Sequence, residues 1–300
     1  MIKNFIDIDN FDKKELKKIL IFAKKIKSKR NLKSSLLHNK SLGLIFEKQS
    51  MRTRLSFSIG MQKLGGNVIE LDINKIGFGT RESYKDLLNV MSQYLDVLLI
   101  RNDNHEILKQ LASFNILPII NGLSDYSHPC QILSDIFTIE EKLGSIERQK
   151  ISWLGDFNNV LVSLIQAAEI FEFQLNILIP EACKNNAKKH LKNKKLKFIK
   201  FHDEFKKGLK GADCVMTDVW TSMGKKNNKQ KKQILSEFQV NDKIMNLANK
   251  NAIFMHCLPA HRNEEVTDSV IDGKQSVVLE QASNRMFVQQ AILNYLVNND

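Results

Sequence analysis

Membrane-spanning and secretory segments are absent from this 300-residue sequence. No apolar run approaches the roughly 18 residues that a membrane-spanning helix needs. The N-terminus mixes Asp, Lys and apolar residues, without an uninterrupted hydrophobic stretch or a small-residue cleavage site, so it indicates no secretory signal. The 4 cysteines lie far apart and form no C-x-x-C pair, which argues against a disulfide framework and against a zinc site. We therefore expect a cytoplasmic protein that binds no membrane and no metal.

Several widespread catalytic motifs are also missing. The sequence contains no G-x-x-x-x-G-K-[ST] phosphate loop and no G-x-G-x-x-G after a predicted strand, which removes the main support for nucleotide hydrolysis and for dinucleotide redox chemistry. It contains neither H-E-x-x-H nor G-x-S-x-G, so the sequence gives no motif support for a metalloprotease or an α/β-hydrolase. We expect no cofactor.

The net charge of +12 raises the possibility of a non-catalytic nucleic-acid-binding protein. Most of the basic excess is lysine, gathered in runs such as 184–200 and 225–232 on predicted solvent faces. Lysine-rich faces of this kind are typical of a hydrated surface. We therefore favour a protein that does not bind nucleic acid, and salt-sensitive binding would support the alternative.

Strand-like apolar runs alternate with helical patterns along the chain. Strands are predicted at 42–46, 67–71, 96–100, 117–120, 151–155, 175–179, 197–201, 212–217 and 252–256, with a final helix at about 281–297. Such alternation favours parallel sheets covered by helices on both faces. A restart after Gly144 predicts an α/β fold of two doubly wound parallel-sheet domains, 1–143 and 144–285.

The segment 50–54, Ser-Met-Arg-Thr-Arg, lies between a predicted strand and a predicted helix. Unpaired backbone N–H groups and the positive end of the helix dipole favour an anion at such a position. Arginine adds forked donors that match phosphate oxygens. The alternative is a helix capped by Ser50 with exposed arginines on its first turn.

Further polar residues follow other predicted strands. In parallel α/β sheets, ligands bind at the carboxyl ends of the strands. The residues at these positions are Arg101, His128, Gln131, Asp156, Asn158, Asn159, Asp218 and Cys257. Each has an ordinary alternative: an ion pair for Arg101, a helix start for His128, a turn for Asn158 and Asn159, a helix cap for Asp218 and an inert thiol for Cys257.

Taken in order, these segments resemble the aspartate/ornithine transcarbamylase family. The resemblance rests on Ser-Met-Arg-Thr-Arg at 50–54, Arg101, His-Pro-Cys-Gln at 128–131, Asp-Val-Trp-Thr-Ser-Met-Gly at 218–224, His-Cys-Leu-Pro at 256–259 and Glu-Gln-Ala-Ser-Asn-Arg at 280–285. The segments at 218–224 and 256–259 are similar to the branch of the family that uses ornithine. The matching segments extend over essentially the whole chain.

The resemblance implies transfer of a carbamoyl group from carbamoyl phosphate to the δ-amine of L-ornithine, in a cleft between the two domains. It implies that Ser50, Met51, Arg52, Thr53, Arg101, His128, Gln131, Cys257, Leu258 and Arg285 hold carbamoyl phosphate, with Arg101, His128 and Cys257 at the reaction centre. It implies that Asn159, Asp218, Ser222 and Met223 hold ornithine. It further implies a homotrimer, and a C-terminal helix at 286–300 that completes the first domain.

Two positions depart from the family's pattern. Met51 stands where a threonine is usual, and Lys75 occupies a stretch where many relatives have glutamine. Two other enzyme functions also stay open, a transcarbamylase for another amine and a hydrolase that uses Cys257 with His256. Adjacent strand residues point to opposite faces, so these two make a poor pair. The direction of the reaction in arginine metabolism, synthesis or breakdown, is left open.

Overall fold

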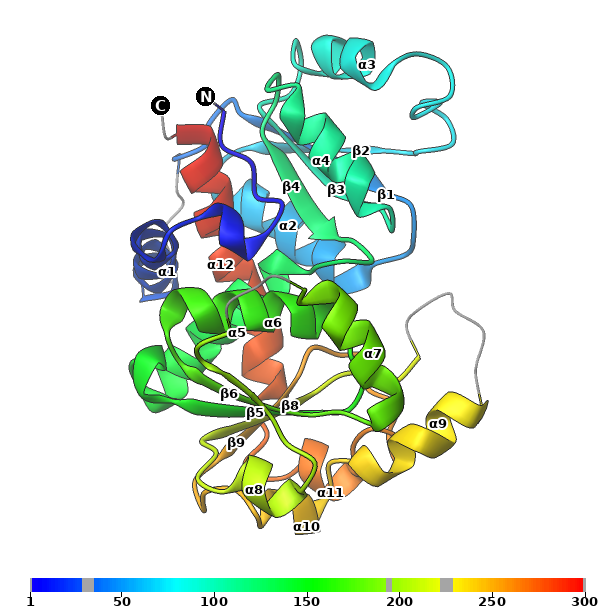
Figure 1. Cartoon of the computed structure of the whole chain (residues 1–300). Helices are drawn as coiled ribbons and strands as arrows, with labels where there is room; N and C mark the ends of the chain where they lie inside the picture. The colour runs from blue at the N-terminus through cyan, green and yellow to red at the C-terminus, as the bar shows by residue number, and fades with distance from the viewer. Residues whose placement is uncertain (1, 29–34, 193–195, 222–228, 299–300) are drawn as a thin grey trace. The chain divides into compact units, whose positions relative to one another are not determined.

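The computed structural model describes residues 2–28, 35–192, 196–221 and 229–298. The chain forms two compact units, which we describe separately: unit 1 comprises Met1–Ser134 with Ser283–Asp300, and unit 2 comprises Asp135–Ala282. Each unit contains one sheet in which all strand pairs are parallel, with helices packed against it (Figure 1). The predicted fold class of two parallel-sheet α/β domains is confirmed.

Unit 1 alternates strands with helices. Its elements are η1 (Ile8–Asn10), α1 (Lys13–Ser28), β1 (Ser41–Phe46), α2 (Met51–Lys63), β2 (Asn67–Leu71), α3 (Tyr84–Met91), β3 (Val97–Arg101), α4 (His105–Ser113), β4 (Ile119–Leu123), the start of α5 (Pro129–Leu143) and most of α12 (Val278–Asn298). The helix α1 begins with a reciprocal pair, in which Glu15 N–H donates to Asp12 and Asp12 N–H donates to Glu15.

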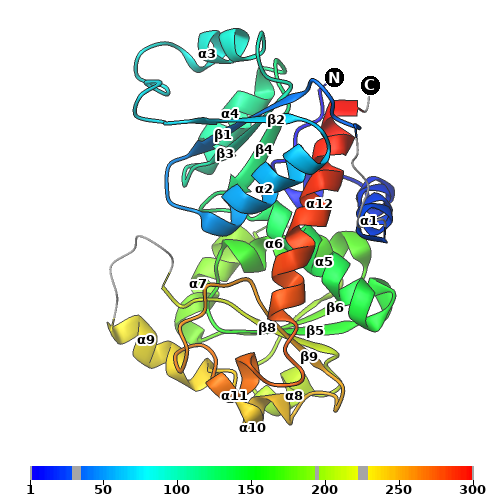
Figure 2. The same ribbon diagram turned by 180° about the vertical axis from the view of Figure 1, so that it is seen from behind.

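The sheet of unit 1 has the strand order β2-β1-β3-β4. Its direction of winding reverses between β1 and β3, where Phe46 pairs with Arg101. The N-terminal segment adds to the free edge of β4, because Phe5 bridges Ile120 in parallel. Figure 2 shows α2 and α12 side by side on one face of this sheet, and Gln290 of α12 donates to the carbonyl of Gly60 in α2.

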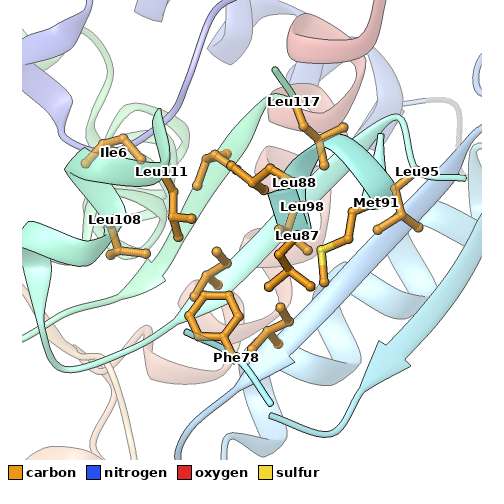
Figure 3. Close-up of a cluster of buried hydrophobic side chains, with 13 residues drawn as sticks. Ile6, Phe78, Leu87, Leu88, Met91, Leu95, Leu98, Leu108, Leu111 and Leu117 are labelled. Carbon is orange, nitrogen blue, oxygen red and sulfur yellow. The ribbon is translucent and has the colours of Figure 1, made fainter. Parts of the chain in front are cut away.

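The opposite face of this sheet is covered by α3 and α4. Their apolar side chains form a buried cluster with residues of the strands (Figure 3). Leu87, Leu88 and Met91 come from α3, and Leu108 and Leu111 come from α4. Burying a side chain of this size stabilises the fold by about 1.5–3 kcal/mol, so the packing fixes both helices on the sheet.

Unit 2 repeats the alternation, with shorter helices toward its end. Its elements are the rest of α5, η2 (Ile146–Arg148), β5 (Lys150–Leu154), α6 (Asn159–Phe171), β6 (Gln174–Leu178), α7 (Glu181–His190), β7 (Ile199–Phe201), α8 (Phe205–Leu209), β8 (Cys214–Thr217), α9 (Lys229–Leu235), η3 (Ser236–Phe238), α10 (Asp242–Met245), β9 (Ile253–His256) and α11 (Asp268–Ile271). The strand order is β7-β6-β5-β8-β9, so the winding reverses between β5 and β8.

The structure differs from the sequence-based expectation at β4. The prediction ended this strand at Ile120 and began a loop at Asn121, whereas β4 continues to Leu123. The extra length is held by the N-terminal segment, since Asn121 N–H donates to the carbonyl of Phe5 at 2.9 Å. Asparagine is depleted in strands, so this pairing overrides its local preference. Nowhere in the described part of the chain is a helix long and apolar enough to cross a membrane.

Candidate functional site

In unit 1 the predicted anion-binding residues gather where the sheet reverses direction. Ser50 follows β1, and Arg101 is the last residue of β3. These two strands are neighbours, with Phe46 paired to Arg101. The carboxyl ends of strands at such a reversal form the crevice in which doubly wound sheets bind ligands. The fold therefore brings the two motifs together although 51 positions separate Ser50 from Arg101.

Ser50 occupies the N-cap position of α2, but its hydroxyl makes no capping hydrogen bond. Its Oγ instead accepts a hydrogen bond of 2.9 Å from Nη1 of Arg101. The first turn of α2 carries no acidic side chain, which is uncommon at a position where carboxylates are stabilised. The sequence left two interpretations of this segment, a helix capped by Ser50 and an anion site. Because the Ser50 hydroxyl does not cap α2, we keep the anion site as the candidate.

Arg285 reaches the same region from α12. Its Nη2 donates to Oγ1 of Thr53 at 2.9 Å, and its Nη1 donates to Oε1 of Gln131 at 2.6 Å. The side chains of all three residues are buried. These two bonds orient the guanidinium. Arg285 thus carries a positive charge beside the N-terminus of α2, which is itself positive.

His128 completes this group at the start of α5. Its ring is buried, and burial together with the positive charges of Arg285 and Arg101 holds the pKa of His128 well below the usual 6.5. The imidazole is therefore neutral near pH 7 and has one N–H to donate. We call Ser50, Thr53, Arg101, His128, Gln131 and Arg285 the unit 1 cluster.

The other two predicted residues of this motif lie on the first turn of α2. Met51 is its first residue, and its side chain is 64% exposed, while Arg52 is partly buried. Arg54 faces elsewhere: it forms an ion pair of 2.7 Å with Glu70 and lies over the ring of Phe46. The two arginines of the segment therefore differ, and Arg54 serves the pairing of α2 with the sheet.

The site residues of unit 2 also lie where its sheet reverses, after β5 and β8. Asn158 is the N-cap of α6, and its Oδ1 accepts from the N–H groups of Val160 and Leu161. Its Nδ2 donates to Oδ2 of Asp218 at 2.7 Å. The thiol of Cys257 donates to the other oxygen, Oδ1, at 2.9 Å. Asp218 is thus oriented by two hydrogen bonds at the carboxyl ends of the strands.

Asp218 lies in irregular structure after β8 and caps no helix, so that alternative is wrong. Cys257 is partly exposed and bonded to a carboxylate, unlike an inert core thiol. Asn159 is the first residue of α6 and is partly exposed. Ser222 and Met223, the other two predicted ornithine residues, lie outside the described residues. We call Asn158, Asp218 and Cys257 the unit 2 cluster.

Both ring nitrogens of His256 are engaged in hydrogen bonds. Its Nδ1 accepts from the N–H of Leu258 at 2.9 Å, so the ring hydrogen is on Nε2, which lies 3.1 Å from Oε1 of the buried Glu265. With both nitrogens engaged, His256 does not serve Cys257 as a base, and the hydrolase alternative loses its dyad. The bond to Leu258 supports a left-handed backbone there, with φ at 53°.

Asp218, His256 and Cys257 are also close enough together to be compared with a metal site. One donor atom each from Asp218, His256 and Cys257 lies within 4.8 Å of the others. His256 would have to release the Leu258 N–H or Glu265 to coordinate an ion. We therefore assign no metal to this group.

Asn158 was predicted from the sequence as a polar residue at a strand end, with a turn as the alternative, and the structure places it at the N-cap of α6. Glu265, which also organises the unit 2 site, was not predicted, because no sequence pattern pointed to it. Its partner His256 ends β9, and a hydrogen bond between a loop carboxylate and a strand end has no characteristic spacing in the sequence. Lys75, at a departure from the family's pattern, is 85% exposed and lies 4.0 Å from Asp72.

The two clusters are typical of a protein that binds two small molecules, one through an anionic group and one through an ammonium group. Unit 1 presents guanidinium, hydroxyl and helix N–H donors for a small anion such as a phosphate. Unit 2 presents an oriented carboxylate, which suits an ammonium group. Both sites occupy the positions where doubly wound sheets bind small molecules.

Family models match both halves of the chain. Residues 3–141 match the carbamoyl-P binding domain of aspartate/ornithine carbamoyltransferase, and residues 147–296 match its Asp/Orn binding domain. The chain therefore belongs to the aspartate/ornithine carbamoyltransferase family. It is a carbamoyl-transferring enzyme, as its motifs predicted.

Individual relatives agree with this membership. An ornithine carbamoyltransferase of Rhodopseudomonas palustris is 44% identical over 98% of this chain and 96% of its own length. That of Bradyrhizobium diazoefficiens is 43% identical over 97% and 96%. The solved ornithine carbamoyltransferase from Pyrococcus furiosus superposes with a TM-score of 0.93 at 36% identity, covering 99% of this chain and 98% of that one.

Proposed function

We propose that this protein transfers the carbamoyl group of carbamoyl phosphate to the δ-amine of L-ornithine, giving L-citrulline and phosphate. In the cell this reaction would serve arginine metabolism in the cytoplasm. The reaction changes no oxidation state, so it needs no redox cofactor. Full-length relatives that bear the name ornithine carbamoyltransferase support the choice of substrates.

The observation that carries the donor half is the buried guanidinium of Arg285 beside the N-terminus of α2. It is fixed by Thr53, 232 positions earlier in the chain, and by Gln131. Paired guanidinium and helix N–H donors match the oxygens of a phosphate ester. Arg52, on the same first turn, would add a second positive charge to the leaving phosphate.

For the acceptor half, the support is the carboxylate of Asp218. Held by Asn158 and Cys257, it would pair with the α-ammonium of ornithine. Asn159 would donate to the α-carboxylate. An amino acid bound at this end extends its side-chain amine away from the contact, which orients the nucleophile. Ser222 and Met223 are proposed as further contacts on the strength of the motif at 218–224.

The chemistry follows from these roles. The neutral δ-amine attacks the carbonyl carbon, a C–N bond forms, the C–O bond to phosphate breaks, and the proton lost by nitrogen leaves with the phosphate. Arg101 and neutral His128 would donate to the carbonyl oxygen as negative charge develops there. Removing one well-placed donor of this kind typically costs about 3–4 kcal/mol of transition-state stabilisation. Cys257 and Leu258 would line the reaction centre.

A colorimetric citrulline assay with carbamoyl phosphate and a panel of amines tests the proposal. The panel contains ornithine, aspartate, putrescine and an acylated ornithine, each with product identified by mass spectrometry. Ornithine should be carbamoylated fastest, because only it offers an α-ammonium for Asp218, an α-carboxylate for Asn159 and a distal amine. Faster turnover of another amine would replace ornithine as the acceptor while preserving the donor site.

A homotrimer is the assembly we propose. Its support in the described residues is an apolar stripe on α2, formed by Met51, Leu55 and Ile59, whose side chains are 64%, 54% and 40% exposed. The spacing of four residues places them on one face of the helix. Contiguous exposed apolar side chains mark interaction surfaces, and a second copy of the chain is the proposed occupant.

A further inference from the structure

Three buried side chains outside the motifs form a continuous hydrogen-bonded relay in unit 1. Oδ2 of Asp7 lies 3.1 Å from Nε2 of His105, and Nδ1 of His105 lies 2.8 Å from Oγ of Ser124. Their exposed fractions are 7%, 6% and 0%. The order of groups resembles that of a hydrolase triad, but a serine that is fully buried cannot meet a substrate, so the relay has another role.

The relay joins three segments that are distant in the chain. Asp7 follows the N-terminal segment, which is fixed to the sheet because Phe5 N–H donates to the carbonyl of Ile119 at 2.8 Å. His105 is the first residue of α4, and Ser124 follows β4 directly. His105 also packs against the ring of Tyr126, with 4.8 Å between the ring centres.

Ser124 transmits the position of His105 to the turn before His128. The N–H of Ser127 donates to Oγ of Ser124 at 3.2 Å, and the N–H of Ser124 donates to the carbonyl of Ser127 at 2.9 Å. Oγ of Ser124 thus contacts both Nδ1 of His105 and the N–H of Ser127, and the next residue after this turn is His128.

We propose that Asp7, His105 and Ser124 are positioning residues that hold the turn 124–127, and through it the imidazole of His128, for the transfer reaction. This inference rests on the proposed function, in which His128 donates to the carbonyl oxygen. The same turn is tied to the strand end that carries Arg101, because Asp125 N–H donates to the carbonyl of Asp103 at 2.9 Å. The N-terminal segment thus reaches the donor site without touching the substrate.

A double-mutant cycle in the full-length protein tests this. Ser124→Ala removes the hydroxyl with the smallest change of shape, and His128→Asn removes the imidazole. We expect Ser124→Ala to lower kcat by about 10-fold in the native background and by less than about 2-fold in the His128→Asn background, since groups that act as a unit are not additive. Equal losses in both backgrounds would overturn the proposal.

Two further variants separate positioning from a general loss of stability. Leu111→Ala truncates a buried residue of the same helix α4 that belongs to the apolar cluster, so it should lower the melting temperature while its effect on kcat combines independently with His128→Asn. If Ser124→Ala does not fold, His105→Phe keeps the ring that packs on Tyr126 and removes both hydrogen bonds. It should show the same dependence on His128, and independence would count against the relay.

The cycle is also measured on binding of carbamoyl phosphate alone, by titration calorimetry without an amine. If the native protein makes no citrulline, the proposed acceptor chemistry fails, and the coupling between Ser124 and His128 in carbamoyl phosphate binding still decides the relay. If citrulline forms but neither measurement shows coupling, the relay is wrong and the function stands.

Discussion

At the scale of single residues, Arg285, which contacts α2 from α12, and Arg54, which belongs to α2, provide a direct comparison. Arg285→Gln should lower kcat/KM for carbamoyl phosphate by about 100-fold or more, because a buried charged donor is lost from the anion site. Arg54→Gln is the matched control. Arg54 is paired with Glu70 at a partly exposed position, so its loss should change kcat/KM by less than about 2-fold. Steady-state citrulline assays measure both, and equal losses would contradict the assignment.

His128 predicts a pH dependence of stability. Its folded-state pKa lies well below 6.5 because of burial, Arg285 and Arg101, so the unfolded chain binds the proton more readily. The stability tied to the neutral ring is therefore complete above about pH 6.5 and is lost as the pH falls below that value. Urea unfolding at pH 7.5 and pH 5.5 should show a larger acid loss in the native protein than in His128→Gln. An equal loss would mean that His128 is not the group responsible.

At the scale of elements, the position of Met51 at the N-terminus of α2 gives a prediction of what it contributes to the proposed donor site. Its side chain is 64% exposed, which leaves the backbone N–H as its means of binding an anion. Met51→Thr should therefore change the KM for carbamoyl phosphate by less than about 2-fold. Met51→Pro removes the N–H together with the exposed side chain, at a position where proline is tolerated in a helix, and it should raise that KM several-fold where Met51→Thr does not. A large improvement with threonine would show instead that the missing hydroxyl matters.

The elements of unit 1 also show what local sequence could predict. The strand before Ser50 was predictable from its apolar run, and the candidate anion site from the residues that follow it. The extension of β4 through Asn121 was not, because it depends on pairing with Phe5, more than a hundred positions away in the chain. The same limit applies to Ser124 and His105. Their hydrogen bond depends on the ends of two strands meeting, and no local spacing records it.

In unit 2, local sequence could predict which residues belong to the site but not how they bond to one another. Asp218 and Cys257 were selected because unusual polar residues follow apolar strands. Their direct bond, and the role of Asn158 in fixing the carboxylate, depend on segments after β5, β8 and β9 meeting in the fold. Asn158 uses its oxygen for the helix and its nitrogen for Asp218. Asn158 therefore both caps α6 and orients the carboxylate of Asp218.

At the scale of the whole molecule, the two sheets share one arrangement of their candidate site residues. Each places its polar residues at its own reversal of strand order, after β1 and β3 in unit 1 and after β5 and β8 in unit 2. The net charge of +12, which by itself suggested nucleic acid, fits an enzyme whose proposed donor is an anion. Part of that charge is balanced locally, as where Lys184 pairs with both Glu181 and Asp203.

The assembly of the whole molecule gives the last prediction. Leu55→Lys places a charge in the centre of the apolar stripe of α2, and burying it between copies of the chain would be costly. We expect the native protein to sediment as a trimer and Leu55→Lys to shift toward monomer. Val90→Lys, on α3, is the control, since Val90 and Leu55 are both 54% exposed. It should remain trimeric. Trimers of Leu55→Lys in sedimentation velocity would remove α2 from the interface.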